Sequence, residues 1–327
     1  MNIIEISQKF PTEFDAIKHF EKYRWGKTII CPFCNSKKIS KRTKDNRWHC
    51  LSCNRTFSVT TKTQIHNTRL TLQKWLFAFG LISDAKKGIS AKQLERNLGI
   101  HYETAWKMYH QIRDLMSIEN EKIHLDHIVE LDTKIVDEDM RKCQAEKKGT
   151  PTHIPELDDQ KEYYTKKGFE FKEGKYKKPC KVGNQKRGEG ASNKKIAGAV
   201  ARDGDVIAHV VKNTSFKELR KIIDKYVNKD RKKTVLLTDE ARSNLKFKEI
   251  INHIVINHKK MYSYRGLNTN TIESFWAIIE RQIVGQHHHV DIKYLDKYVN
   301  EAVFKFNNRK HDDMFKSLIK LAMVDKN

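Results

Sequence analysis

Residues 234–239 read TVLLTD, and this stretch decides the fold because a continuous apolar run leads directly into an acid. A short apolar run of this kind is typical of a strand buried on both faces, as in the centre of an α/β sheet. Residues 127–132, HIVELD, also read as a strand that ends on an acid. Open α/β sheets bind ligands at the carboxyl ends of their strands. The two stretches therefore predict a site around Asp132 and Asp239.

A helix supplies a third acid. The pattern of residues 269–284 predicts a helix with one buried apolar stripe, formed by Ile272, Phe275, Trp276, Ile279 and Ile283. Glu273 lies at the edge of this stripe, so its carboxylate can face the rim of the sheet. Three carboxylates from two strand ends and a helix can hold two Mg²⁺ or Mn²⁺ ions for phosphoryl transfer.

Other acids compete for these roles. Glu130 lies on the same strand face as the first acid, and Glu240 directly follows the second. Glu280, two turns beyond the third acid on the same helix flank, is the strongest rival for that position. Any one of these carboxylates alone is better explained as a solvated or capping group, so the hypothesis depends on the complete set.

Further elements complete an α/β core. We expect strands at 195–201, 206–212 and 253–257 and helices at 216–228 and 291–307. Residues 133–192 interrupt this order, and we interpret them as an insertion or a long loop rich in Gly, Pro and Lys. Its lysines, which we expect to contact DNA, are Lys161, Lys166, Lys167, Lys172, Lys175, Lys177, Lys178 and Lys181.

Two cysteine pairs precede the core. Cys31 and Cys34 form one C-x-x-C knuckle, and Cys50 and Cys53 form another after fifteen intervening residues. Two knuckles at this separation favour one structural Zn²⁺ in a closed tetrahedron, with four reduced, unliganded thiols as the alternative. Basic residues around this zinc ribbon indicate that it also contacts phosphates: Lys37, Lys38, Lys41, Arg42, Lys44, Arg47 and Arg55. The remaining cysteines, Cys143 and Cys180, have no paired partner and are interpreted as free thiols.

Residues 88–115 predict two helices joined by a tight turn. Ser90 can cap the first helix, and Gly99 can end it in the left-handed conformation. The second helix has Ala105, Met108, Tyr109 and Ile112 on one face. This pattern is typical of a helix-turn-helix, whose second helix can enter the major groove, although a helical hairpin without a DNA role looks the same. The residues expected to contact DNA are His101, Tyr102, Thr104 and Lys107.

The composition favours a nucleic-acid partner. The chain has 327 residues, a formal net charge of +23 and a pI of about 9.6. A charge of this size points to a polyanion rather than to a surface adapted only for solubility. An apolar run long enough to span a membrane and a signal peptide are both lacking, so we expect no membrane partner.

Seven stretches together resemble one known family. They are RWGKTIICPFC, FSVTTKTQIHNTRLTLQKWLFAFGLI, SAKQLERNLGIHYETAWKMYHQIRDLM, VELD, TDE, NTNTIESFWAIIERQIVGQHHHV and YLDKYVNEAVFKFNNR. The chain resembles the bacterial insertion-sequence DDE transposases of the ISXO-like type, which have an N-terminal zinc ribbon, a helix-turn-helix and an RNase H-like catalytic core. In this family His287, His288 and His289 correspond to a loop after the catalytic helix, so we assign no metal to them.

The resemblance implies site residues and chemistry. It implies catalytic Asp132, Asp239 and Glu273, two catalytic Mg²⁺ or Mn²⁺ ions, and cleavage and strand transfer at the terminal inverted repeats of the element. Asn270 is an auxiliary candidate, because some relatives are described with Asn in place of the third acid. Arg281 is a second auxiliary candidate, since the family usually has a Lys where Glu280 stands. The other departures are Thr133 in place of an acid and Lys62 in place of a Gly.

The expected organisation is multidomain. A lead helix and zinc ribbon occupy 1–60, a helix-turn-helix region 61–122, an RNase H-like mixed-sheet core 123–310 and a C-terminal tail 311–327. We expect a homo-oligomer on element and target DNA in the cytoplasm of a prokaryotic cell, associated with the nucleoid. The alternatives are an inactive relic or DNA-binding regulator that keeps only the ribbon and helix-turn-helix, and a stand-alone nuclease or resolvase.

Overall fold

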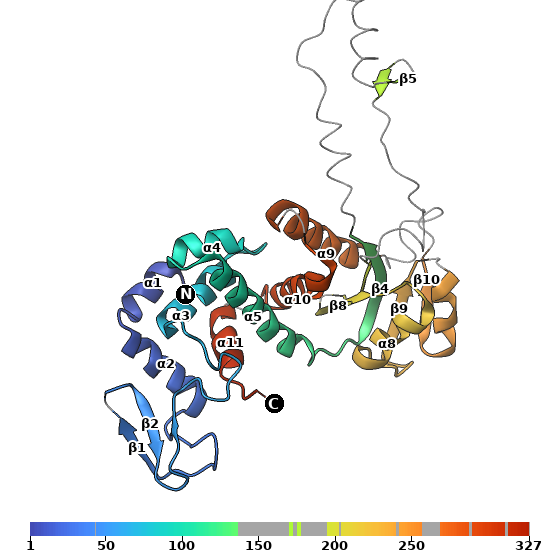
Figure 1. Cartoon of the computed structure of the whole chain (residues 1–327). Coiled ribbons are helices and arrows are strands. Elements are labelled where there is room, and N and C mark those ends of the chain that lie inside the picture. Colours follow the sequence, from blue (N-terminus) through green and yellow to red (C-terminus); the bar gives the residue numbers. More distant parts are fainter. Residues whose placement is uncertain are drawn as a thin grey trace, which may run out of the picture.

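The computed structural model describes residues 1–42, 44–136, 170–172, 175–177, 195–202, 204–239, 242–256, 269–287, 290–310 and 313–326. Figure 1 shows a small ribbon, a body of helices and a sheet with its own helices. Most of the interruption expected at 133–192 lies outside the described residues, together with Cys143, Cys180, Glu240, His288 and His289. Within it, strands β5 (Glu170–Lys172) and β6 (Lys175–Lys177) pair antiparallel.

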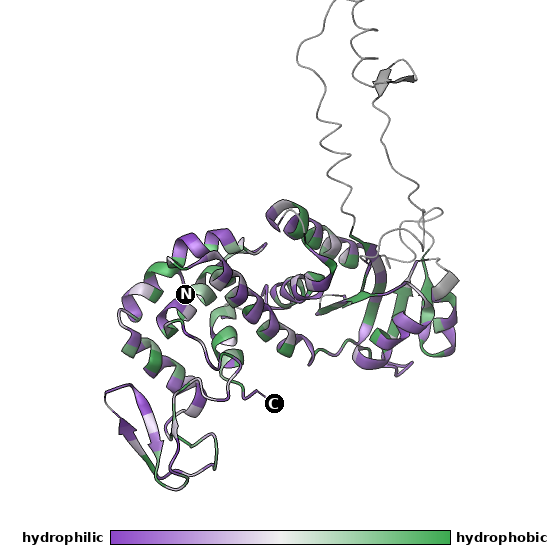
Figure 2. Ribbon diagram, viewed as in Figure 1, coloured by the Kyte–Doolittle hydropathy of each residue, from purple (hydrophilic) through white to green (hydrophobic). Residues whose placement is uncertain are grey.

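The ribbon is a three-stranded antiparallel sheet of β1 (Ile39–Arg42), β2 (Arg47–Cys50) and β3 (Thr56–Phe57). Its strands are mostly hydrophilic, whereas those of the central sheet are largely hydrophobic (Figure 2). The buried members of its core are only Cys31, Cys50 and Phe57. A core of this size cannot hold a module together unaided, so the ribbon needs a crosslink or a metal.

The helical body packs around one core. Its helices are α1 (Ile3–Lys9), α2 (Glu13–Trp25), α3 (Leu72–Asp84), α4 (Ala91–Leu98), α5 (Tyr102–Asn120) and α11 (Met314–Ala322). Residues 311–327 were expected as a tail, whereas most of them form α11, which contacts α2, α3 and α5. The reason is a helical stripe of Phe315, Leu318 and Ile319 buried in the same core. Across the described ranges, we find no helix with the length and apolarity that a membrane span requires.

The local signals for α4 and α5 are confirmed. The Ser90 side chain accepts a hydrogen bond from the Gln93 backbone N–H, and Gly99 ends α4 in the left-handed conformation, at φ 57° and ψ 49°. The N–H of Gly99 donates to the carbonyl of Glu95, as expected of a helix end that glycine terminates. The predicted inward face of α5, Ala105, Met108, Tyr109 and Ile112, is buried.

The central sheet has five strands in the order β10-β9-β4-β7-β8. Their bounds are β4 (His127–Ile135), β7 (Lys195–Ala201), β8 (Val206–Val211), β9 (Thr234–Thr238) and β10 (Asn252–Val255). Strands β10, β9 and β4 are parallel, whereas β7 runs antiparallel to β4 and β8. The prediction that the first strand ends at Asp132 was wrong, because β4 continues to Ile135 by pairing with β7 after its pairing with β9 has ended.

Helices follow the strands in the predicted order. They are α8 (Phe216–Tyr226), the 3₁₀ helix η1 (Arg242–Glu249), α9 (Asn270–Glu280), the π-helix η2 (Arg281–His287) and α10 (Ile292–Asn307). The helix expected at 269–284 therefore changes geometry after Glu280, but its predicted apolar stripe is buried throughout. The side chain of Asn307 accepts from the Val206 N–H (2.8 Å) and donates to the Val206 carbonyl (2.9 Å), which ties α10 to β8.

A buried ion network joins α5 to α10. The fully buried carboxylate of Glu301 accepts hydrogen bonds from Tyr109 Oη (2.6 Å), Arg113 Nε (2.8 Å) and Lys305 Nζ (2.8 Å). Burial alone would raise the pKa of Glu301, but the charges of Lys305 and Arg113 outweigh burial and hold that pKa well below its usual range. Gly88 leaves room for the network, because a Cβ there would lie 2.8 Å from Glu301 Oε1.

We predict that Glu301→Gln destabilises the protein by about 3–5 kcal/mol, because two buried cations lose their counter-charge. The depressed pKa of Glu301 means that its contribution is present at neutral pH and declines as the pH falls below the usual range of a glutamate. Urea unfolding at neutral pH measures the loss. Glu218→Gln, which breaks the exposed pair with Lys221, is the control and should leave the midpoint nearly unchanged. Equal midpoints for the two variants would contradict this role of Glu301.

Candidate functional site

The register between β4 and β9 brings two predicted acids together. Leu131 pairs with Thr238 in the parallel ladder, so Asp132 and Asp239 come next on neighbouring strands and lie at the same edge. Asp239 directly follows the last residue of β9, and both acids are half-buried. On its other side, Asp132 lies opposite Gly198 of β7. Parallel pairing thus places these carboxylates side by side, although 107 residues separate them in the sequence.

The third acid lies within electrostatic reach of the first. Burial raises the pKa of Asp132, the backbone N–H of Thr133 and the indole N–H of Trp276 oppose the rise, and the charges of Asp239 and Glu273 add to it. Trp276 Nε1 donates to Asp132 Oδ2 at 2.9 Å. A cation among the three carboxylates would relieve their mutual repulsion.

The other two acids have different surroundings. Asp239 accepts a hydrogen bond from Asn244 Nδ2, so the helix η1 orients this carboxylate. Glu273 lies in the first turn of α9 and is exposed, and Thr269 Oγ1 approaches its Oε1 at 3.5 Å. The exposed position of Glu273 leaves its carboxylate accessible from solvent.

The structure gives two of the rival acids other partners. Glu280 forms an ion pair with Lys134 Nζ at 2.6 Å. Glu130 is fully buried, accepts the backbone N–H of Ile272 at 2.9 Å and pairs with Arg202 Nη2 at 3.4 Å. Because Lys134 engages Glu280, this contact favours Glu273 over Glu280 as the third acid, and Glu130 is engaged by Ile272 and Arg202 within the protein.

The two auxiliary candidates lie at opposite ends of α9. Asn270 is the first residue of this helix and is exposed, three residues before Glu273. Arg281 follows the last residue of α9, and its Nε donates to the Ala277 carbonyl at 2.8 Å. Eight residues separate Arg281 from Glu273, a distance of about 12 Å along a helix. Of the two, Asn270 is the better placed to assist the acids.

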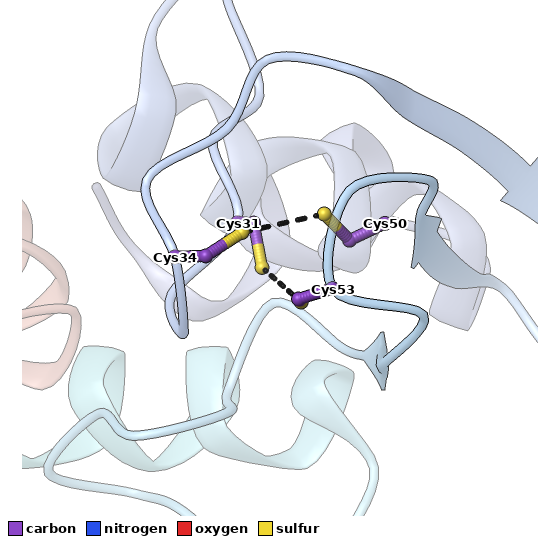
Figure 3. A group of neighbouring side chains, drawn as sticks. All are labelled: Cys31, Cys34, Cys50 and Cys53. Atoms are coloured by element: carbon purple, nitrogen blue, oxygen red, sulfur yellow. Dashed lines mark hydrogen bonds between the residues drawn. The ribbon is translucent and has the colours of Figure 1, made fainter.

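The four predicted zinc ligands converge at one point (Figure 3). All four sulfur atoms lie within 4.8 Å of one another, with Cys31 and Cys53 at 3.7 Å and Cys34 and Cys50 at 3.5 Å. Four ligands at a Zn–S distance of 2.3 Å in a tetrahedron would be about 3.8 Å apart, so the cluster fits structural Zn²⁺. It is the one group of three or more metal-ligating side chains found so close together in the described part of the chain.

The backbone prepares both zinc knuckles in the same way. The N–H of Cys31 donates to the Ser36 carbonyl, and the N–H of Cys50 donates to the Arg55 carbonyl. In each turn the residue after the second cysteine is an asparagine with positive φ, 58° at Asn35 and 55° at Asn54. Asparagine tolerates this left-handed conformation better than most residues. Each pair of sulfurs is therefore held by local structure as well as by any bound metal.

The residues expected to contact DNA lie at the start of α5. His101, Tyr102 and Lys107 are exposed and Thr104 is half-buried, on the side away from the helical core. Lys92 Nζ, which pairs with Glu95 at 2.6 Å, lies 5.7 Å from the Tyr102 ring centroid. The side chains of His101, Tyr102 and Lys107 are thus accessible to solvent at the start of α5.

Two features of the site were missed at the level of sequence. Trp276 was assigned only to the apolar stripe, but its indole N–H also binds Asp132. Gly198 was not singled out, although a Cβ there would lie only 2.7 Å from Trp276 Cη2. A glycine inside a strand is a known sign of close approach by another group, and this was the available signal.

We predict one tightly bound Zn²⁺ per chain, lost in the double variant Cys50→Ser, Cys53→Ser, because two of its four thiolates are removed. Loss of the metal should also unfold the ribbon, since zinc binding supplies folding energy to such small modules. Elemental analysis measures the metal, with Cys143→Ser as the control that retains it. Equal zinc in the double variant and the wild-type protein would refute the assignment.

Two family models match the chain. Residues 11–56 match the transposase zinc-ribbon domain, and residues 168–307 match the ISXO2-like transposase domain. The second range includes Asp239 and Glu273, whereas Asp132 precedes it. Comparison with curated proteins and with solved structures gave no match. Both matches agree with the resemblance of the sequence motifs and with the four-cysteine cluster, so the chain carries a transposase zinc-ribbon domain and an ISXO2-like transposase domain.

Proposed function

We propose that this chain is an active transposase that cuts DNA at the ends of an insertion sequence and joins those ends to target DNA. The observation that carries the proposal is the strand register that brings Asp132 and Asp239 to one edge of the sheet, with Glu273 close enough for its charge to raise the pKa of Asp132. The order of the strands, with β7 antiparallel next to β4, supports the RNase H-like core that the family resemblance implies.

The three acids would hold two Mg²⁺ or Mn²⁺ ions. Bound there, the ions would supply Lewis-acid chemistry at the attacking and leaving oxygens. The raised pKa of Asp132 supports this role, because its burial and the charges of Asp239 and Glu273 disfavour its negative charge, which a nearby cation would stabilise. The reaction itself has two displacements. Water attacks a phosphodiester and releases a 3′-hydroxyl, and that hydroxyl then attacks a phosphodiester of the target and displaces its 3′-oxygen.

We predict that Asp132→Asn, Asp239→Asn and Glu273→Gln each lower cleavage by at least about a hundredfold while DNA affinity is unchanged. An amide brings no negative charge to balance the ions, so each acid is needed for chemistry rather than for binding DNA. The assay measures cleavage and joining of a duplex that carries the element's ends, with Mg²⁺ or Mn²⁺, beside a gel-shift measurement of affinity.

Glu280→Gln is the matched control for these variants. It lies on the same helix, and its pair with Lys134 should make it dispensable for cleavage. If Glu280→Gln were inactive and Glu273→Gln active, the third ligand would be Glu280. If the wild-type protein cut none of its own ends with either metal, the inactive relic or regulator would be the correct function.

We further propose that α5 reads the element's ends while basic side chains of the ribbon bind phosphates. The supporting observations are the exposed first turns of α5 and a ribbon whose residues 27–62 include nine Lys or Arg but one Asp or Glu. Cations also lie over ribbon aromatics, Arg55 at 4.9 Å and Lys62 at 5.1 Å from the Phe33 ring centroid. The basic side chains of the ribbon could thus bind phosphates of the DNA backbone while α5 enters a groove.

We predict that Tyr102→Ala and Lys107→Ala reduce the preference for element ends over random DNA by about tenfold, because base contacts specify sequence. By contrast, Lys37→Ala with Lys38→Ala should weaken both DNAs alike and lower the salt dependence of binding. Binding titrations at several salt concentrations separate the two effects. Unchanged specificity in the α5 variants would place sequence recognition in another element.

A further inference from the structure

We propose that Glu130 and Trp276 are positioning residues that set the first and third acids of the site relative to each other; this proposal rests on the function proposed above. Two hydrogen bonds connect β4 to α9. Glu130 Oε2 accepts the backbone N–H of Ile272 at 2.9 Å, and Trp276 Nε1 donates to Asp132 Oδ2 at 2.9 Å. The acceptor of the first bond is Glu130, two residues before Asp132, and the acceptor of the second bond is Asp132 itself.

The two bonds have matching spacings on strand and helix. Glu130 and Asp132 are two residues apart on one face of β4, a distance of about 6.6 Å. Ile272 and Trp276 are four residues apart on one face of α9, a rise of about 6 Å. Because these distances agree, both bonds form together only when α9 lies alongside β4 at one offset. Glu273 follows Ile272 directly, so this offset also sets where the third carboxylate lies.

The first bond is anchored in the protein interior. Glu130 is fully buried, and its other oxygen pairs with Arg202 at 3.4 Å. The N–H of Ile272 belongs to the first turn of α9, where backbone donors have no partner within the helix. A carboxylate at a helix N-terminus is also favoured by the helix dipole. Shifting α9 along the sheet would therefore leave a buried charge and a buried donor poorly paired.

The second bond depends on the absence of a side chain at Gly198. This residue lies opposite Asp132 in the β4–β7 ladder, and a Cβ there would lie 2.7 Å from Cη2 and 3.2 Å from Cζ2 of Trp276. The indole therefore lies over the space that glycine leaves, with its N–H directed at the acid. The ring is buried, which limits its freedom to turn away.

The kinetic test uses Trp276→Phe, which keeps an aromatic ring but removes the donor, and Gly198→Ala, which keeps the donor but adds a Cβ that would crowd the ring and lie 3.1 Å from the Ile207 carbonyl oxygen. We expect the cleavage rate at saturating DNA to fall by about tenfold to a hundredfold in both, because small misplacements of catalytic groups cost that much. The affinity for DNA and the zinc content should be unchanged. Glu280→Gln, which removes the Lys134 contact between the same strand and helix, should keep the wild-type rate. Wild-type rates in Trp276→Phe would overturn the proposal.

A second measurement does not require activity. The indole N–H of Trp276 is one of five in the chain and is identified in a ¹H–¹⁵N spectrum by its absence from Trp276→Phe. Asp132→Asn should shift this signal more than the other four, because its acceptor loses a charge, and Mn²⁺ should broaden it selectively in the wild-type protein. If the signal responds in this way but the wild-type protein does not cleave, the positioning contacts stand and the proposed function fails. If Asp132→Asn leaves the signal unmoved, the contact is absent and the proposal is overturned.

Discussion

The parallel pairing of β4 with β9 is the constraint on which the rest of the site depends. Their register brings Asp132 and Asp239 to the same edge, where two acids repel each other. Beyond Leu131, β4 continues by pairing antiparallel with β7. Asp132 therefore lies within a strand whose backbone is hydrogen-bonded to β7, and not in a loop. The helix that brings Glu273 can then be aligned against fixed backbone, which a loop would not offer.

A second constraint links the helical body to this sheet. The carboxylate of Glu301 binds Tyr109 and Arg113 of α5 from within α10, and Asn307 at the end of α10 binds the backbone of β8. The chain of contacts from the start of α5 to the sheet therefore consists of buried polar groups and packed helices. If α5 reads the ends of the element, the distance from the recognised bases to the acids is set by this packing.

Local patterns explain how much of this could be predicted. The apolar runs of the strands, the cap at Ser90, the left-handed Gly99 and the cysteine spacing are each encoded within a few residues, and all appear in the structure. The contacts made by Trp276 and Glu130 could not be predicted, because each depends on the alignment of a helix with a strand more than 130 residues away. In the same way, the apolar stripe of α11 is visible in the sequence, but its packing against the N-terminal helices depends on elements far away in the chain.

The partners of the acids separate those that form internal ion pairs from those that could bind a metal ion, a distinction that the sequence alone does not reveal. Glu130 and Glu301 are fully buried and each meets a cation, so their charges are balanced within the protein. For Asp132, burial is the main cause of a raised pKa; the charges of Asp239 and Glu273 add to the rise, and the N–H groups of Thr133 and Trp276 oppose it. An arrangement of this kind costs stability, and proteins retain such costs mainly where function requires them. A divalent cation bound among Asp132, Asp239 and Glu273 would relieve this repulsion, whereas Glu130 and Glu301 already have cationic partners within the protein.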